Sequence, residues 1–179
     1  MNTFDIPEYP LHIMGANALN KEKALALRLQ KNERCFVCGD ENPYGLKVKV
    51  IYDGKKSVFA DFIADERYGG WSNYLHGGIL SMIFDELLGW LSVYLGYDAV
   101  TARLEVRYRE PVPLGSRIRF TGTLEKQTRL LLDIKTTAQL EDGSVAAEGS
   151  GRMMIIKVNT SGSSPNESVS EYATRLMDS

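Results

Sequence analysis

The feature that most constrains the fold is an apolar segment, residues 77–95, that is interrupted by the adjacent acids Asp85 and Glu86. It is about long enough to span a bilayer, but charges near the middle of a span are costly in lipid. A helix that is apolar on all sides is buried in protein. We therefore predict a buried helix over residues 78–95 and no membrane association. Its apolar positions are Ile79, Leu80, Ile83, Phe84, Leu87, Leu88, Leu91, Val93 and Tyr94.

The segments on either side of this helix alternate apolar and polar residues, which is typical of strands with one buried face. Asp-Gly pairs at 53–54 and 142–143 predict tight turns between neighbouring strands. Short connections between strands predict an antiparallel sheet and the α+β class, with the sheet wrapped around the helix. We expect a partner subunit to cover the remaining helix surface. The predicted strands lie within residues 46–64, 100–110, 116–125, 129–141 and 144–158.

The length of 179 residues and the hydrophobic content of 44% are those of one folded domain. We assign residues 1–34 to an N-terminal extension with a helix at 17–33, residues 35–158 to the domain, and residues 159–179 to a partly disordered tail. A net charge of −2 argues against a nucleic-acid partner, since such surfaces usually carry a basic excess. The first residues lack the pattern of a secretory signal, so we expect a cytoplasmic protein.

The two cysteines, Cys35 and Cys38, precede a segment that reads as turn and loop. Their close spacing is unlike the disulfide framework of a secreted protein and fits a reducing compartment. A structural zinc site normally takes four ligands, which would require His12 and His76 to converge on the cysteines. A redox pair of this spacing should open a helix in a βαβ setting. We therefore expect two partly buried cysteines and no metal.

Several motifs follow one another in order: His-Gly-Gly at 76–78, an acid nine residues after that histidine, a strand ending in Tyr-x-x-Pro, a strand after a glycine, and an Asp-Gly hairpin. Together they resemble the hotdog-fold acyl-CoA thioesterases of the phenylacetate-type (PaaI-like) group. The segment CFVCGDENPYGL resembles the entry segment of a subset of hotdog proteins. The resemblance covers about two thirds of the chain, residues 35–158. It implies a curved antiparallel sheet around one long central helix, and active sites between the subunits of a homodimer or homotetramer.

The resemblance implies that Asp85 is the catalytic acid; a buried carboxylate is costly, so Asp85 must in either case be paired or face a wet cleft. It would activate water as a general base or attack the acyl carbon itself; the alternative is a structural carboxylate at a subunit interface. Gly77 and Gly78 lie where a loop meets the helix, and their N–H groups would polarise a thioester carbonyl. The alternative is that the glycines only permit a tight turn. For Glu86, about 100° further round the helix, we expect a structural ion pair.

The resemblance also implies that His76 fixes the loop and contacts the thioester region, and that Thr101 orients the nucleophilic water. A regular strand would place Thr101 on the face opposite Tyr108, and an ordinary strand threonine is the alternative. The candidate substrate-binding residues are Trp71, Asn73, Tyr74 and Ser81 near the acyl group, and Arg103 and Arg129 for the phosphates of coenzyme A. The alternatives are that the aromatic residues only pack against the protein and that the arginines only form the solvent-facing side of a strand.

These assignments predict hydrolysis of an acyl-CoA thioester to a carboxylic acid and CoA through Asp85, with no cofactor, since coenzyme A is part of the substrate. One alternative is a non-catalytic acyl-CoA-binding or regulatory protein, which would not depend on Asp85. Another is an acyl-thioester dehydratase or hydratase, in which a histidine and an acid have a different spacing. The acyl group itself stays open, because the pocket depends on how the loop at residues 67–75 folds.

Overall fold

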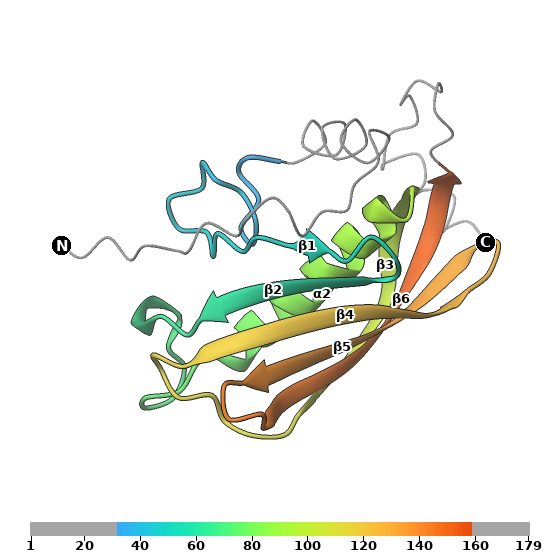
Figure 1. Cartoon of the computed structure of the whole chain (residues 1–179). Helices are drawn as coiled ribbons and strands as arrows, with labels where there is room; N and C mark the ends of the chain where they lie inside the picture. Colours follow the sequence, from blue (N-terminus) through green and yellow to red (C-terminus); the bar gives the residue numbers. More distant parts are fainter. Residues whose placement is uncertain (1–31, 159–179) are drawn as a thin grey trace. The chain divides into compact units, whose positions relative to one another are not determined.

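The computed structural model describes residues 32–158, which form one long helix and a six-stranded antiparallel sheet (Figure 1). The helix predicted at 17–33, except for its last two positions, and the tail at 159–179 lie outside the described residues. The elements are β1 (Ile51–Tyr52), β2 (Ser57–Ile63), the 3-10 helix η2 (Glu66–Tyr68), α2 (Gly77–Tyr94), β3 (Tyr97–Tyr108), β4 (Arg117–Gln127), β5 (Leu131–Leu140) and β6 (Val145–Val158).

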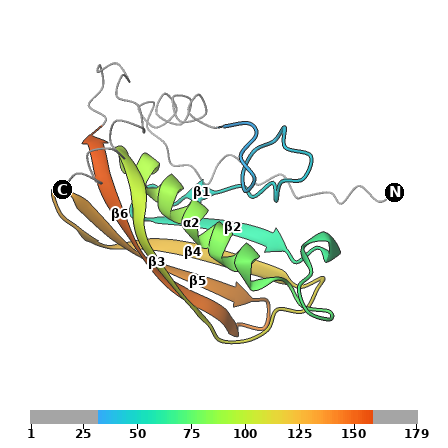
Figure 2. The same cartoon turned by 180° about the vertical axis from the view of Figure 1, so that it is seen from behind.

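The strands lie in the order β1-β2-β4-β5-β6-β3, and every neighbouring pair is antiparallel. The sheet curves, and α2 lies along its inner face in contact with β2 to β6 (Figures 1 and 2). This is the α+β arrangement predicted for the chain, a curved antiparallel sheet around one central helix, and the prediction is confirmed. β3 is an edge strand, so one row of its backbone groups has no partner strand among the described residues.

The helix begins at Gly77, one residue before the predicted start, and ends at Tyr94. Seven of its nine predicted apolar positions are buried against the sheet, whereas Val93 and Tyr94 are half-buried. Within the described chain the helix is not covered on every side, because Asp85 is exposed; its cover by a partner subunit stays a prediction. The sheet covers only one side of the cylinder, and the side that carries Asp85 faces outward. No helix in the described part of the chain is long and apolar enough to cross a membrane.

The first predicted hairpin is only partly formed, because β1 contains two residues rather than the whole of 46–52. Lys47 has a φ of 59°, which is incompatible with an extended strand. Its neighbours pair instead with the cysteine segment: the N–H of Leu46 donates to the carbonyl of Phe36 at 2.8 Å, and the N–H of Val48 donates to that of Val37 at 2.9 Å. The side chains of Leu46 and Val48 are nevertheless buried, as the alternation of apolar and polar residues predicted.

Both predicted Asp-Gly turns are confirmed. Gly54 and Gly143 have φ values of 80° and 88°, a region that glycine enters at little cost. The Asp53 carboxylate accepts hydrogen bonds from three successive N–H groups after it, at residues 55–57. Each Asp-Gly pair therefore forms the tight turn that the alternating segments before and after it had predicted.

Edge strand β3 departs from regular alternation at a β-bulge. Thr101 pairs with Met153 and Arg103 pairs with Arg152, which leaves Ala102 as the extra residue. An extra residue shifts the inward and outward positions of a strand by one. Ala102 is exposed, so its predicted place in the buried set was wrong.

Candidate active site

The carboxylate of Asp85 lies beside the hydroxyl of Thr101. The hydroxyl oxygen of Thr101, on β3, is 2.7 Å from Oδ1 of Asp85, on α2. The same hydroxyl is 3.3 Å from Sδ of Met153, but a thioether is a weak acceptor. The Thr101 proton therefore goes to the carboxylate, and the two lone pairs of the hydroxyl oxygen stay available to a further donor such as water.

The β3 bulge is what allows this contact. Thr101 and Tyr108 are seven residues apart and would point to opposite faces of a regular strand. With the bulge between them, both hydroxyls face α2: that of Thr101 meets Asp85, and that of Tyr108 lies 2.6 Å from Oγ of Ser81. The prediction that Thr101 belongs to the face opposite Tyr108 was wrong, because the sheet pairing inserts a residue that alternation does not reveal.

The start of α2 offers fewer free donors than predicted. Nδ1 of His76 accepts a hydrogen bond from the N–H of Gly78 at 2.9 Å, so His76 caps the helix. The Gly78 amide is thereby occupied. Among the described residues the N–H of Gly77 has no acceptor, and it remains the available donor. His76 fixes the junction of loop and helix in this way, whereas its contact with a thioester stays a prediction.

Tyr108 packs closely against position 77. Its hydroxyl is 3.2 Å from the carbonyl oxygen of Gly77, and a Cβ at that position would lie 3.2 Å from the tyrosine ring. Ser81, predicted to border the acyl group, uses its hydroxyl on Tyr108 instead. Sequence reasoning missed Tyr108 as a neighbour of the site, although the Tyr-x-x-Pro motif had marked the residue.

The other predicted substrate contacts are open to solvent. Trp71 is 91% exposed, Asn73 is exposed and Tyr74 is 42% exposed. Arg103 pairs with Glu105 on the same strand, and Arg129 lies exposed in the connection from β4 to β5. Their roles toward an acyl group or CoA phosphates stay predictions.

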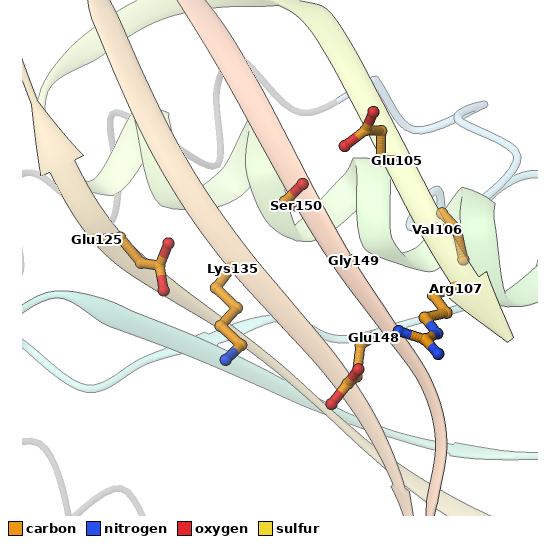
Figure 3. A pocket seen from close by; sticks show the side chains of 8 residues that line it. All are labelled: Glu105, Val106, Arg107, Glu125, Lys135, Glu148, Gly149 and Ser150. Atoms are coloured by element: carbon orange, nitrogen blue, oxygen red, sulfur yellow. The ribbon is translucent and has the colours of Figure 1, made fainter. Parts of the chain in front are cut away.

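A hollow of about 370 Å³ lies on the face of the sheet away from α2. None of the predicted site residues lines it, and its charged side chains are of both signs (Figure 3). The hollow is therefore separate from Asp85. Its lining residues are Glu105, Val106, Arg107, Glu125, Lys135, Glu148, Gly149 and Ser150.

Among residues 32–158, the two cysteines lie beside Glu86 and are grouped with no histidine. The Sγ atoms of Cys35 and Cys38 and a carboxylate oxygen of Glu86 are all within 4.8 Å of one another. Burial, reinforced by the nearby Glu86 carboxylate, raises the pKa of the Cys38 thiol far above its usual value. The ion pair predicted for Glu86 is wrong within the described chain: its carboxylate accepts the indole N–H of Trp90 at 2.8 Å and lies 3.8 Å from Sγ of Cys35.

Residues 72–147 match the family model described as the Thioesterase superfamily. A solved structure of a Streptococcus mutans UA159 protein bound to acetyl CoA is 18% identical, with a TM-score of 0.60, covering 63% of this chain and 91% of that one. A hypothetical thioesterase with coenzyme A from Streptococcus pneumoniae TIGR4 is 17% identical, with a TM-score of 0.60, covering 63% of this chain and 91% of that one. The E. coli PaaI protein from the phenylacetic acid degradation operon is 15% identical, with a TM-score of 0.64, covering 78% of this chain and 94% of that one.

Two further structures of the Streptococcus pneumoniae thioesterase each carry one substitution to alanine, of an aspartate in one and of a threonine in the other. Each is 16% identical to this chain with a TM-score of 0.58, over 61% of this chain and 90% or 89% of that one. The two substituted positions are 16 residues apart, the same separation as Asp85 and Thr101. These likenesses establish the hotdog fold of the chain.

Proposed function

We propose that this chain, whose residues 72–147 match the Thioesterase superfamily model, is a hotdog-fold thioesterase that hydrolyses acyl-CoA thioesters to a carboxylic acid and CoA with Asp85 as general base or nucleophile. The observation that carries the proposal is the 2.7 Å hydrogen bond from Thr101 to Asp85 on the exposed side of α2. A packed interior carboxylate would have no access to substrate. Here the carboxylate is held in one orientation and is still open to a ligand.

The proposed reaction uses both groups of this pair. Asp85 takes a proton from water as the water oxygen attacks the acyl carbon, or attacks that carbon directly to form an anhydride that water then opens. The C–S bond breaks and CoA leaves as its thiol. Thr101 holds the carboxylate through its proton, and its oxygen can accept a hydrogen bond from the attacking water. An oriented base of this kind typically contributes about 10²–10⁴-fold to the rate.

The helix start would supply the oxyanion donor, and helix geometry then requires a second copy of the chain. Gly77 and Asp85 are eight residues apart, a rise of about 12 Å along the axis. One thioester carbonyl has to lie within about 3–3.5 Å of both its donor and its attacking group. The amide of Gly77 and the carboxylate of Asp85 in one chain are too far apart for that. We therefore propose that each site combines Asp85 of one subunit with Gly77 of the other.

The exposed surface of the chain fits this assembly. β3 is a long edge strand of 12 residues, and the uncovered side of α2 lies beside it. Pairing β3 with β3 of a second copy would satisfy the open backbone groups, and the same contact would bring the second copy beside Asp85. A homodimer is the smallest assembly with these properties, and a dimer of two such dimers retains them. The proposed interface therefore also forms the proposed site.

CoA is the proposed thioester carrier because the Streptococcus mutans and Streptococcus pneumoniae neighbours hold acetyl CoA and CoA. The Streptococcus pneumoniae protein was also altered at an aspartate and a threonine with the spacing of Asp85 and Thr101, which is consistent with their use as a pair. Arg103 and Arg129 remain the proposed contacts to CoA phosphates.

The test is release of CoA thiol from short, medium, long and aromatic acyl-CoAs by the full chain. We expect steady turnover of at least one class. An acyl-CoA that binds without any thiol release would reject hydrolysis and favour the binding-protein alternative.

Sharing of the site between subunits is tested by mixing two inactive variants, Asp85→Asn and Gly77→Val. A hybrid dimer regains one intact site, so activity should return on mixing; no recovery from exchanged subunits contradicts the shared site.

A further inference from the structure

We propose that Cys35, Cys38 and Glu86 bind a zinc ion that fastens the loop before β1 to helix α2. The three side chains come from two segments about 50 residues apart in the sequence, and their ligand atoms lie within 4.8 Å of one another. Thiolate sulfur and carboxylate oxygen are both common zinc ligands. None of the three has a part in the proposed thioester chemistry, so this is a separate site.

The cysteine loop is built tightly enough to present both sulfurs to one point. The N–H of Gly39 donates to the carbonyl of Cys35 at 3.0 Å, which closes a turn across the two cysteines. A Cβ at position 39 would lie 2.5 Å from the backbone nitrogen of Cys35, so only glycine fits there. The Nζ of Lys47 donates to the carbonyl of Gly39 at 3.0 Å and holds the turn from outside. Two cysteines separated by two residues have the spacing of a zinc-ligand pair.

Glu86 is aimed at the cysteines by a second interaction. The indole N–H of Trp90, one turn later on α2, donates to Oε1 of Glu86 at 2.8 Å. This leaves Oε2 directed at Cys35, 3.8 Å from its Sγ. Metal-binding carboxylates are usually oriented by such an outer hydrogen bond. The contact with Trp90 therefore gives Glu86 the fixed position that a ligand needs.

The distances are close to those of a loaded site. Two sulfurs at about 2.3 Å from a tetrahedral zinc ion are about 3.8 Å apart. The ligand atoms here span at most 4.8 Å, so movements of about 1 Å bring them into coordination. Three protein ligands leave one tetrahedral position for a solvent molecule. Sequence reasoning looked for histidines as the missing ligands and overlooked Glu86.

A cation fits the charges of these ligands. A divalent ion would stabilise two thiolates and a carboxylate that lie together. Binding then displaces two protons from the cysteines, and the ion with its three ligands carries a net charge of −1.

The test is the zinc content of the purified full chain after dialysis, and after equilibration with excess zinc and removal of the free metal. We expect about one zinc per chain, loss of that zinc in Cys35→Ser and Cys38→Ser, and at least about tenfold weaker binding in Glu86→Gln. Glutamine retains an oxygen for the Trp90 N–H, so this variant should keep its fold. Cobalt in place of zinc should show thiolate-to-metal charge transfer and the absorption of tetrahedral cobalt.

The matched control is Asp85→Asn, which alters the adjacent acid on another side of α2 and should leave the zinc content unchanged. Wild-type chain that takes up no zinc, or that binds it equally well without Glu86, would overturn the assignment. So would a Cys35–Cys38 disulfide in chain prepared without oxidant. Metal content is read without any activity assay, so this proposal and the thioesterase proposal can fail independently.

Discussion

Replacing Asp85 by asparagine tests the central claim with the least structural disturbance. Asparagine has the same shape, and its Oδ1 can still accept a hydrogen bond from the Thr101 hydroxyl, whose oxygen lies 2.7 Å from Oδ1 of Asp85. The charge-assisted hydrogen bond becomes a neutral one on an exposed side chain, so we expect the free energy of unfolding to fall by no more than about 1 kcal/mol. The amide has no basic or nucleophilic oxygen of comparable strength. The expected loss in kcat is therefore about 10²–10⁴-fold, or about 3–5 kcal/mol of activation free energy.

The assay follows thiol release from the best acyl-CoA substrate, with kcat and KM measured for both proteins and thermal unfolding measured alongside. Glu125→Gln is the matched control, because Glu125 is an exposed acid that lines the hollow on the other face of the sheet and should leave kcat unchanged (Figure 3). A kcat for Asp85→Asn within a few-fold of wild type, in a folded protein, would refute the role of the carboxylate. A loss of activity that coincides with loss of folding would refute the reasoning about its exposure.

Three further outcomes follow from contacts in the structure. Thr101→Ala should lower kcat about 10- to 100-fold, because it removes a hydrogen bond to a charged group, whereas Thr101→Ser should retain most of the activity in the same thiol-release assay. Gly151→Ala should lower the free energy of unfolding in urea by about 1–3 kcal/mol, since its Cβ would lie 1.7 Å from Cδ2 of Leu88. Hydrogen bonds from Arg152 hold the pKa of Asp133 below its usual 3.8. The pair therefore stabilises the fold at pH values above 3.8, and this stabilisation is lost as the pH falls through the lower pKa of the folded state. Arg152→Gln should therefore flatten the acid limb of unfolding free energy against pH below about pH 5; an unchanged limb contradicts the assignment.

The elements of this fold were predictable from the sequence because their signals are local. The apolar positions of α2 and the alternation in β4 correspond to the buried faces, with Ile118 and Phe120 fully enclosed. The Asp53-Gly54 and Asp142-Gly143 turns appear where the residue types require them. Each of these features depends on neighbours within a few positions along the chain, which is the range over which periodicity carries information.

The short β1 was not predictable in the same way. Residues 46–50 alternate like a strand, and both Leu46 and Val48 are buried. Their backbone partners are nevertheless Phe36 and Val37, and Lys47 adopts a positive φ between them. Alternation reports which side chains are buried, but it does not report which segment receives the hydrogen bonds.

The sequence by itself determined the candidate acid, the glycine junction and the threonine, because their residue types and order are visible in one dimension. Only the tertiary structure decided how they meet. The pairing of β3 with β6 inserts the bulge that turns Thr101 toward Asp85, and the imidazole of His76 accepts the hydrogen bond from the Gly78 N–H. The fold likewise brings Glu86 to the cysteines across about 50 residues. These contacts depend on strand register and on packing between distant segments, and neither is encoded in the spacing of nearby residues.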